Sequence, residues 1–167
     1  EQPASRTLFA ALLNLLQHHA RALLDELLLP TIWCRGGALS AAQAEALTRL
    51  LKELPEGLVG RATAEFLRGE GGQPGPWSEA QVVLLQTLLA RKPAALDGAC
   101  VAELLVQADA NVDGLRKSLK FSNLLNTLVR FHGPALRAHA PALRRVAEKL
   151  ETFMKKSILA AVGKLGE

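Results

Sequence analysis

Apolar residues recur along this chain with the spacing of an amphipathic α-helix, in runs of about three to four turns. Prolines and glycines separate the runs, at Pro30, in the stretch GEGGQPGP (residues 69–76), at Lys92-Pro93 and at Gly133-Pro134. Such residues end or kink helices, so each break marks a helix boundary. The pattern predicts four pairs of helices and a ninth helix, over residues 5–17 with 19–29, 40–53 with 55–68, 78–91 with 96–108, 114–131 with 135–148, and about 150–165.

Helix start signals recur at a nearly constant interval. SAAQ (residues 40–43) and SEAQ (residues 78–81) both fit the capping box, in which Ser and Gln satisfy the free amides of a first helical turn. Ser5 precedes the first helical run, and Asp113 is predicted to cap the seventh. The starts lie 35 to 38 residues apart, which is typical of repeats with two helices each. The sequence therefore predicts an all-α fold, a right-handed solenoid of antiparallel helical hairpins with HEAT-like repeats and a terminal capping helix.

The composition favours helix over sheet. Apolar residues make up 49% of the 167 residues, and there is no Tyr; most of them are Leu and Ala, which enter helices at little cost. The length predicts a single helical-repeat domain over residues 1–167. No apolar run approaches the roughly eighteen residues that a membrane span needs, so we expect no membrane partner. Because the chain opens with Glu1 and its only methionine is Met154, we expect a fragment or a processed form of a longer protein.

Charge is distributed unevenly. Residues 1–114 contain 9 Lys and Arg against 13 Asp and Glu, a net charge of −4, whereas residues 115–167 contain 11 against 3, a net charge of +8. This basic third either binds a phosphate backbone or an acidic partner, or forms the solvated face of surface helices. Binding of duplex nucleic acid is thus an alternative function, although no aromatic residues are interleaved for base stacking. Cys34 and Cys100 lie far apart without ligand spacing, which indicates reduced thiols of an intracellular protein.

Motifs that carry catalytic or metal chemistry are incomplete. DANVDG begins like a calcium loop, with Asp109, Asn111 and Asp113 at ligand positions, but the carboxylate required at position twelve is replaced by Lys120. We therefore predict a polar turn that caps the next helix. The glycine-rich stretch at residues 69–76 lacks the preceding strand and the following GK[ST] of a phosphate loop. Since no carboxylate–His–nucleophile set suggests itself, we expect no catalytic residues, no cofactor and no metal.

The last predicted helix, LETFMKKSILAAVGKL (residues 150–165), divides into two faces. At 100° per residue one arc is apolar and forms the predicted core face, made of Leu150, Met154, Ile158, Ala161, Val162 and Leu165. Phe153 lies about 100° from the centre of this arc, on the flank that carries Lys156 and Lys164. An aromatic residue in that position is typical of an interface anchor with a charged rim. The alternative is that a neighbouring helix or a folded-back C-terminus covers Phe153.

Three blocks of the sequence resemble, in order and spacing, the C-terminal domain of the Fanconi anaemia group E family. They are PASRTLFAALLNLL with the Leu-rich helix after it that ends at Pro30, WSEAQVVLLQTLLARK, and TFMKKSILAAVGKLG near the C-terminus. The similarity runs over nearly the whole chain and rests on helix-packing residues, length and collinearity. It implies a stack of helical hairpins, in agreement with the periodicity.

The resemblance implies a non-enzymatic adaptor in the nuclear Fanconi anaemia core complex, a ubiquitin-ligase assembly that answers DNA interstrand crosslinks. Proteins of this family bridge the group C subunit to the substrate that the complex monoubiquitinates, the second of the group D proteins; group F is a further candidate partner. The end of the family's last helix contributes to substrate binding, which by position implies a partner-binding site at Phe153, Met154, Lys155 and Lys156. Phe153 ranks above Met154, which the helical wheel places inward. DNA would be a secondary partner.

Overall fold

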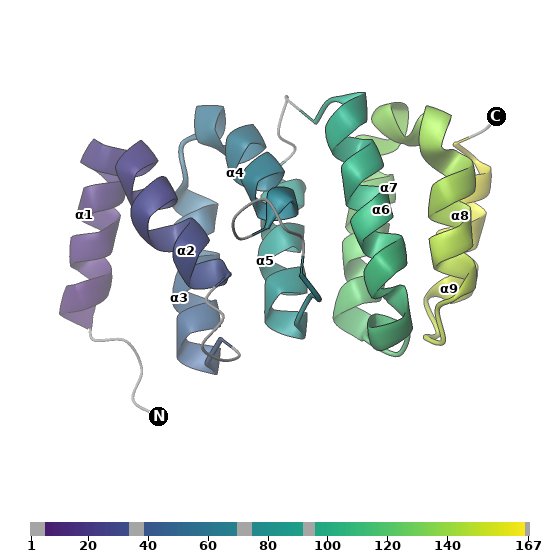
Figure 1. Cartoon of the computed structure of the whole chain (residues 1–167), viewed down its shortest axis with the longest axis horizontal. Helices are drawn as coiled ribbons and strands as arrows, with labels where there is room; N and C mark the ends of the chain where they lie inside the picture. Colours follow the sequence, from purple (N-terminus) through teal and green to yellow (C-terminus); the bar gives the residue numbers. More distant parts are fainter. Residues whose placement is uncertain (1–5, 34–38, 70–74, 92–95, 166–167) are drawn as a thin grey trace.

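The computed structural model describes residues 6–33, 39–69, 75–91 and 96–165. Within these residues the protein is helical and has no β-strand, which confirms the predicted all-α class (Figure 1). The elements in chain order are α1 (Arg6–Leu23), the π-helical turn η1 (Leu24–Leu28), α2 (Leu29–Ile32), α3 (Ala41–Glu53), α4 (Glu56–Arg68), α5 (Glu79–Ala90), α6 (Gly98–Leu115), α7 (Leu119–Leu136), the 3-10 turn η2 (Arg137–His139), α8 (Ala140–Glu148) and α9 (Lys155–Gly163). No helix in this part of the chain is both long and apolar enough to cross a membrane.

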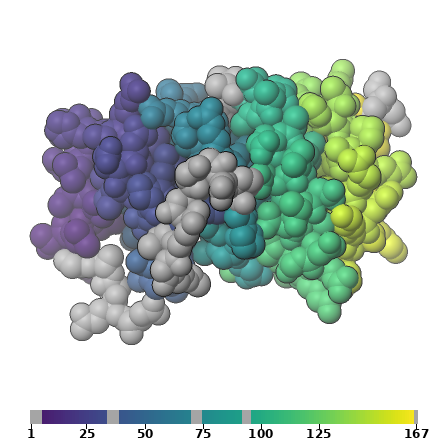
Figure 2. Space-filling model, viewed as in Figure 1, coloured from purple at the N-terminus to yellow at the C-terminus, as the bar shows by residue number. Residues whose placement is uncertain are grey.

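The helices form two rows, and elements that are close in sequence are also neighbours in space. α1, α3, α5, α7 and α9 pack against one another in that order, and α2, α4, α6 and α8 form the second row (Figure 1). The colours of the space-filling view follow one another from purple to yellow along the molecule, so position in the sequence maps onto position along the long axis (Figure 2). The buried apolar side chains form one connected cluster, which extends from Leu16 to Val162.

α5 lies in the middle of the first row and has neighbours on several sides. It packs against α3, α7 and α4. Its buried apolar side chains are Val82, Leu84, Leu85, Leu88 and Leu89. A helix enclosed in this way buries more than one stripe of its surface, which explains why this sequence is apolar on nearly all sides.

The two predicted capping boxes are confirmed, and they set the starts of α3 and α5. The Gln43 N–H donates to Ser40 Oγ at 3.2 Å, and the Ser40 N–H donates to Gln43 Oε1 at 3.0 Å. At α5 the corresponding distances between Ser78 and Gln81 are 3.3 and 2.8 Å. The bounds of α3, α4 and α5 agree with the predicted ones within one residue at most positions. The predicted cap at Ser5 lies outside the described residues, as does the Lys92-Pro93 break.

The first predicted pair is one bent helical run instead of two helices that end at Pro30. The backbone leaves the helical region at His19 (φ −137°, ψ 38°), which confirms a break near residue 18. The π-helical turn and α2 then carry the run past Pro30 to Ile32. Pro30 occupies the first turn of α2, where its missing N–H costs no hydrogen bond within that helix, so the predicted helix end at this proline is wrong.

The predicted start of the seventh helix at Asp113 is also wrong. α6 continues to Leu115, beyond its predicted end at residue 108, because Val112 and Leu115 extend its buried face. Asp113 therefore lies inside α6. The cap of α7 is Ser118, whose Oγ accepts the Phe121 N–H at 3.4 Å.

Gly133-Pro134 bends α7 but does not end it, contrary to the predicted boundary between residues 131 and 135. The helical backbone breaks at His132 (φ −124°, ψ 20°) and resumes to Leu136. The buried His132 ring donates from Nε2 to Leu89 O of α5 at 2.8 Å, which fixes the bend to the neighbouring helix. A β-carbon at Gly133 would come within 3.1 Å of Leu165 Cδ2, so glycine allows the end of the chain to pack closely against α7.

Candidate functional site

The last helix begins later than predicted. α9 starts at Lys155, and residues 150–154, which were expected to be helical, form an irregular connection from α8. Met154 precedes the helix without a side-chain cap. We refer to residues 149–154 as the Phe153 turn.

Hydrogen bonds to the end of α6 and to the first turn of α7 hold the Phe153 turn. The Glu151 N–H donates to Arg116 O at 2.9 Å, and Thr152 Oγ1 lies 2.7 Å from Ser122 Oγ. Ser122 is fully buried, so the turn is tied to the protein interior at this point. The Lys155 side chain donates to Glu148 O, which closes the turn from the side of α9. These contacts fix the backbone on both sides of Phe153.

Phe153 is the most exposed large apolar side chain of the described residues, with 82% of its surface accessible. No element in this part of the chain covers it, so of the two sequence-based alternatives the exposed one is confirmed; residues 166–167 lie outside the described part. Met154 is half-buried and packs against the core, which confirms that it lies inward. Lys155 is half-buried through its bond to Glu148, whereas Lys156 is exposed. The four predicted site residues thus lie together, but their exposure differs.

Several cations of the basic third are paired with carboxylates close to this turn. Glu151 accepts from Arg116 at 3.1 Å and lies 3.8 Å from Lys117 Nζ. On α5, Glu79 accepts from Ser118 Oγ at 2.6 Å and from Lys120 at 3.1 Å. The hydrogen bond from Ser118, and then that from Lys120, hold the pKa of Glu79 below its ordinary value.

Lys149 begins the Phe153 turn and ties it to α6. Its Nζ donates to Asp109 Oδ1 at 2.8 Å, and this hydrogen bond raises the pKa of Lys149 above its ordinary value. Asp109 belonged to the calcium-like stretch, which lies inside α6 and not in the predicted polar turn. Asn111 of the same stretch accepts the Trp77 N–H at 2.7 Å, so these side chains hold neighbouring segments together. Within the described residues, no group of three or more His, Cys, Asp or Glu side chains could hold a metal ion.

The remaining cations of the basic third fall into two groups, those with a partner inside the protein and those without a carboxylate partner. Arg144 pairs with Glu148 at 3.1 Å, and Arg130 lies over the Phe131 ring at 5.2 Å. Over residues 115–165, no carboxylate of the described part pairs with Arg137, Arg145, Lys156 or Lys164. The basic third is therefore partly neutralised, by Glu148 and Glu151 of its own and by Glu79 and Asp109 of the acidic part, a feature that counting charges along the sequence did not predict.

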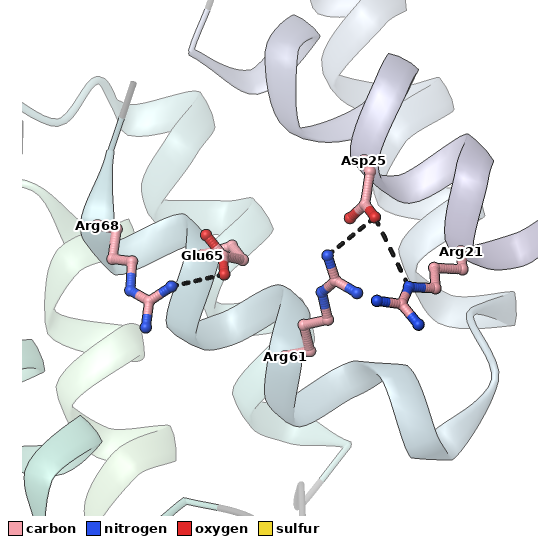
Figure 3. Close-up of polar contacts among 5 residues, drawn as sticks. All are labelled: Arg21, Asp25, Arg61, Glu65 and Arg68. Atoms are coloured by element: carbon pink, nitrogen blue, oxygen red, sulfur yellow. Dashed lines mark hydrogen bonds and ion pairs between the residues drawn. The ribbon is translucent and has the colours of Figure 1, made fainter. Parts of the chain in front are cut away.

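Ion pairs on the first bent run and on α4 were not predicted from the sequence. Asp25 of η1 accepts from Arg61 of α4 at 2.8 Å and lies 4.0 Å from Arg21 of α1, while Glu65 pairs with Arg68 at 2.8 Å (Figure 3). The Asp25–Arg61 contact spans 36 positions of the sequence, about one predicted repeat, and could only have been found from the helix pairing. Since two guanidinium groups share one partly buried carboxylate, these contacts join α4 to the bent first run.

A shallow groove on the outer end of the molecule was also missed. It lies between α1 and α3, has a volume of about 520 Å³, and is lined by Phe9, Ala10, Leu13, Ala42 and Ala46 with Arg6, Glu45 and Arg49. Arg49 pairs with Glu45 at 2.6 Å and lies over the Phe9 ring at 5.7 Å, so two of the three charged residues of the groove are satisfied by internal contacts.

Cys100 is a half-buried free thiol near the start of α6. Burial, and then the carboxylates of Asp97 and Glu103, raise its pKa above the ordinary value. The thiolate that performs nucleophilic or metal chemistry is therefore disfavoured at Cys100. Cys34, the other cysteine, lies outside the described residues.

Comparison with known proteins gives no family for this chain. No protein-family model matches it, and neither a curated protein nor a solved structure does. The likeness to the Fanconi anaemia group E family therefore rests on the three sequence blocks, and what it implies about function is a proposal.

Proposed function

We propose that this chain is a non-enzymatic adaptor of the Fanconi anaemia core ubiquitin-ligase complex in the nucleus. It bridges the group C subunit, and in a larger assembly group F, to the group D substrate that is monoubiquitinated in the repair of DNA interstrand crosslinks. The observation that carries the proposal is Phe153, an 82% exposed aromatic side chain at the position that the resemblance implies for substrate binding.

The physical support is the contrast between the exposed side chain and the fixed backbone beneath it. An exposed Phe gains on the order of 1.5–3 kcal/mol when a partner buries it. Because hydrogen bonds from Glu151 and Thr152 already hold the turn, little backbone entropy is lost on binding. Interface hot spots are commonly single large side chains presented in this manner.

The proposed mechanism is proximity. We propose that the two rows of helices are a right-handed HEAT-like solenoid, which keeps separate surfaces at a fixed distance. An adaptor of this kind raises the effective concentration of the substrate near the ligase and adds no chemistry of its own. The substrate surface would lie at the α9 end, and the group C surface elsewhere on the array.

Titration calorimetry with the purified group D substrate and the purified group C subunit tests this proposal. Phe153→Ala should weaken substrate binding by about ten-fold to a hundred-fold, in line with loss of a hot-spot side chain, and leave group C binding unchanged. Leu15→Ala is the matched control, because Leu15 is 43% exposed on α1, at the opposite end of the molecule from α9 (Figure 1). Equal substrate binding by the wild type and Phe153→Ala, or no binding by the wild type, would contradict the proposal.

Duplex nucleic acid remains a second candidate, favoured by the cations of the basic third that have no carboxylate partner. Fluorescence anisotropy with a DNA duplex tests it, because affinity for phosphates falls steeply, by about ten-fold or more, between about 50 and 200 mM salt. Replacing both Arg137 and Arg145 by Gln should then weaken binding and reduce the salt dependence. Absence of binding at the lower salt concentration would exclude this function.

A further inference from the structure

Leu119 is a second exposed apolar residue beside the Phe153 turn. It is the first residue of α7 and is 47% exposed. Arg116 lies three residues before it and contacts Glu151, while Ser122 lies three residues after it and contacts Thr152. Leu119 and Ser122 lie three apart on α7 and so share one helix face, whereas Arg116 is the C-cap of α6. Leu119 therefore lies one helical turn before one anchor of the turn, and between the two anchors in the sequence. The sequence pattern alone gave no reason to join positions 119 and 153.

The charge around this apolar pair is positive. Arg116, Lys117, Lys120, Lys155 and Lys156 are five cations, and Glu79, Asp113 and Glu151 are three carboxylates, which leaves a net charge of +2. The neighbouring Arg144–Glu148 and Lys149–Asp109 pairs are each neutral. Two exposed apolar side chains inside a basic rim therefore fit a partner whose surface is apolar at its centre and acidic at its edge.

We propose that Leu119 and Phe153 together form a two-point anchor for an apolar partner surface edged by carboxylates. The inference rests on the proposed function and deepens it, because it adds a second anchor residue and specifies the chemistry of the substrate's docking site. Phe153 fills one pocket, and Leu119 covers the apolar ledge beside it. The cations of the rim pair with the acidic edge and fix the orientation of the partner, as charged rims do around apolar hot spots.

The anchor is tested by measuring the affinity of residues 1–167 for the proposed substrate protein with Leu119→Gln, which keeps the size of the side chain and its lack of charge. We expect the Kd to rise about five-fold to ten-fold, less than for Phe153→Ala, since Leu119 has less surface left to bury. Leu15→Gln on α1 is the matched control, because Leu15 is 43% exposed at the opposite end of the molecule. Circular dichroism confirms that each variant is folded.

The rim is tested separately by Lys156→Glu and by salt. We expect Lys156→Glu to weaken binding and to reduce the loss of affinity between about 50 and 300 mM salt. If Phe153→Ala weakens binding but Leu119→Gln does not, the two-point anchor is wrong and the proposed function stands. If Leu15→Gln is as harmful as Leu119→Gln, the anchor is equally overturned. If the wild type does not bind the substrate protein at all, the proposed function fails and the anchor fails with it.

Discussion

α5 and α9 begin in different ways. α5 starts directly after Ser78, whose capping box with Gln81 is visible in the sequence and is complete in the structure. α9 starts after Met154, which supplies no side-chain cap, and the preceding turn is held by Arg116 and Ser122 from another part of the chain. Local chemistry fixes the first helix start, whereas tertiary contacts fix the second.

The difference has a functional counterpart. α5 is buried among its neighbours, and its contribution is stability. The Phe153 turn is not a regular helix start, and it presents an exposed aromatic side chain on a backbone that is held by hydrogen bonds. Substitutions in α5 should therefore change the free energy of unfolding, and those in the turn should change binding.

The largest expected effect on stability is that of Leu85→Ala in α5. Leu85 is fully buried, so the substitution leaves a cavity and should lower the free energy of unfolding by about 2–5 kcal/mol. Chemical denaturation measures this loss. Phe153→Ala is the control and should change stability by less than about 0.5 kcal/mol, as exposed substitutions do. A large stability loss in the control would mean that Phe153 belongs to the core.

A smaller effect is expected at Gln81, which combines a local and a tertiary role. Besides completing the capping box, its Nε2 donates to Ile32 O at 3.0 Å. Gln81→Ala should lower the free energy of unfolding by about 1–3 kcal/mol, because the cap is lost and a carbonyl is left without its partner. Gln43→Ala in the box of α3 removes the cap alone and should cost about 0.5–1 kcal/mol. Equal losses for the two variants would show that the bond to Ile32 contributes nothing.

Ser122→Ala tests whether Ser122 supports the Phe153 turn for binding, in addition to its contribution to the stability of the fold. It removes the partner of Thr152 Oγ1 and should cost about 0.5–1.5 kcal/mol, with a several-fold weaker affinity for the substrate protein because Phe153 is held less firmly. The control is Thr127→Ala, five residues further along α7, which loses the hydrogen bond from Gln86 of α5 at 3.3 Å. Calorimetry should show weaker binding only for Ser122→Ala. Equal binding losses would contradict a positioning role for Ser122.

The smallest expected effect is the pH dependence contributed by Glu79. Its folded-state pKa lies below the ordinary value of 4.5, so the charged form stabilises the fold above that pH, and this contribution is lost as pH falls through the folded-state pKa. Because Glu79 is largely exposed, the contribution is at most about 0.5–1 kcal/mol. Denaturation at pH 7 and pH 3 should show a gap between wild type and Glu79→Gln that closes at the lower pH. A difference in the free energy of unfolding that is the same at both pH values would contradict a contribution from the lowered pKa of Glu79.

The candidate site was predictable in part. The helical wheel places Met154 inside the apolar stripe, and its inward position could be predicted. Whether Phe153 is exposed or covered could not be predicted, because covering depends on elements that are distant along the chain. The start of α9 could not be predicted, since the apolar period continues through residues 150–154 although the backbone there is not helical. The pairing of Lys149 with Asp109 and of Lys120 with Glu79 could not be predicted either, since each joins positions about 40 residues apart.

The sequence by itself determined the all-α class, the capped starts of α3 and α5, and the enclosed character of α5, because propensity, capping and apolar period are local properties. Only the tertiary structure decided that the chain passes Pro30, that α6 extends through Asp113, and that residues 149–154 form a turn. The physical reason is the same in each case. Buried surface and hydrogen bonds from distant residues outweighed weak local signals, and in the last case they left Phe153 exposed.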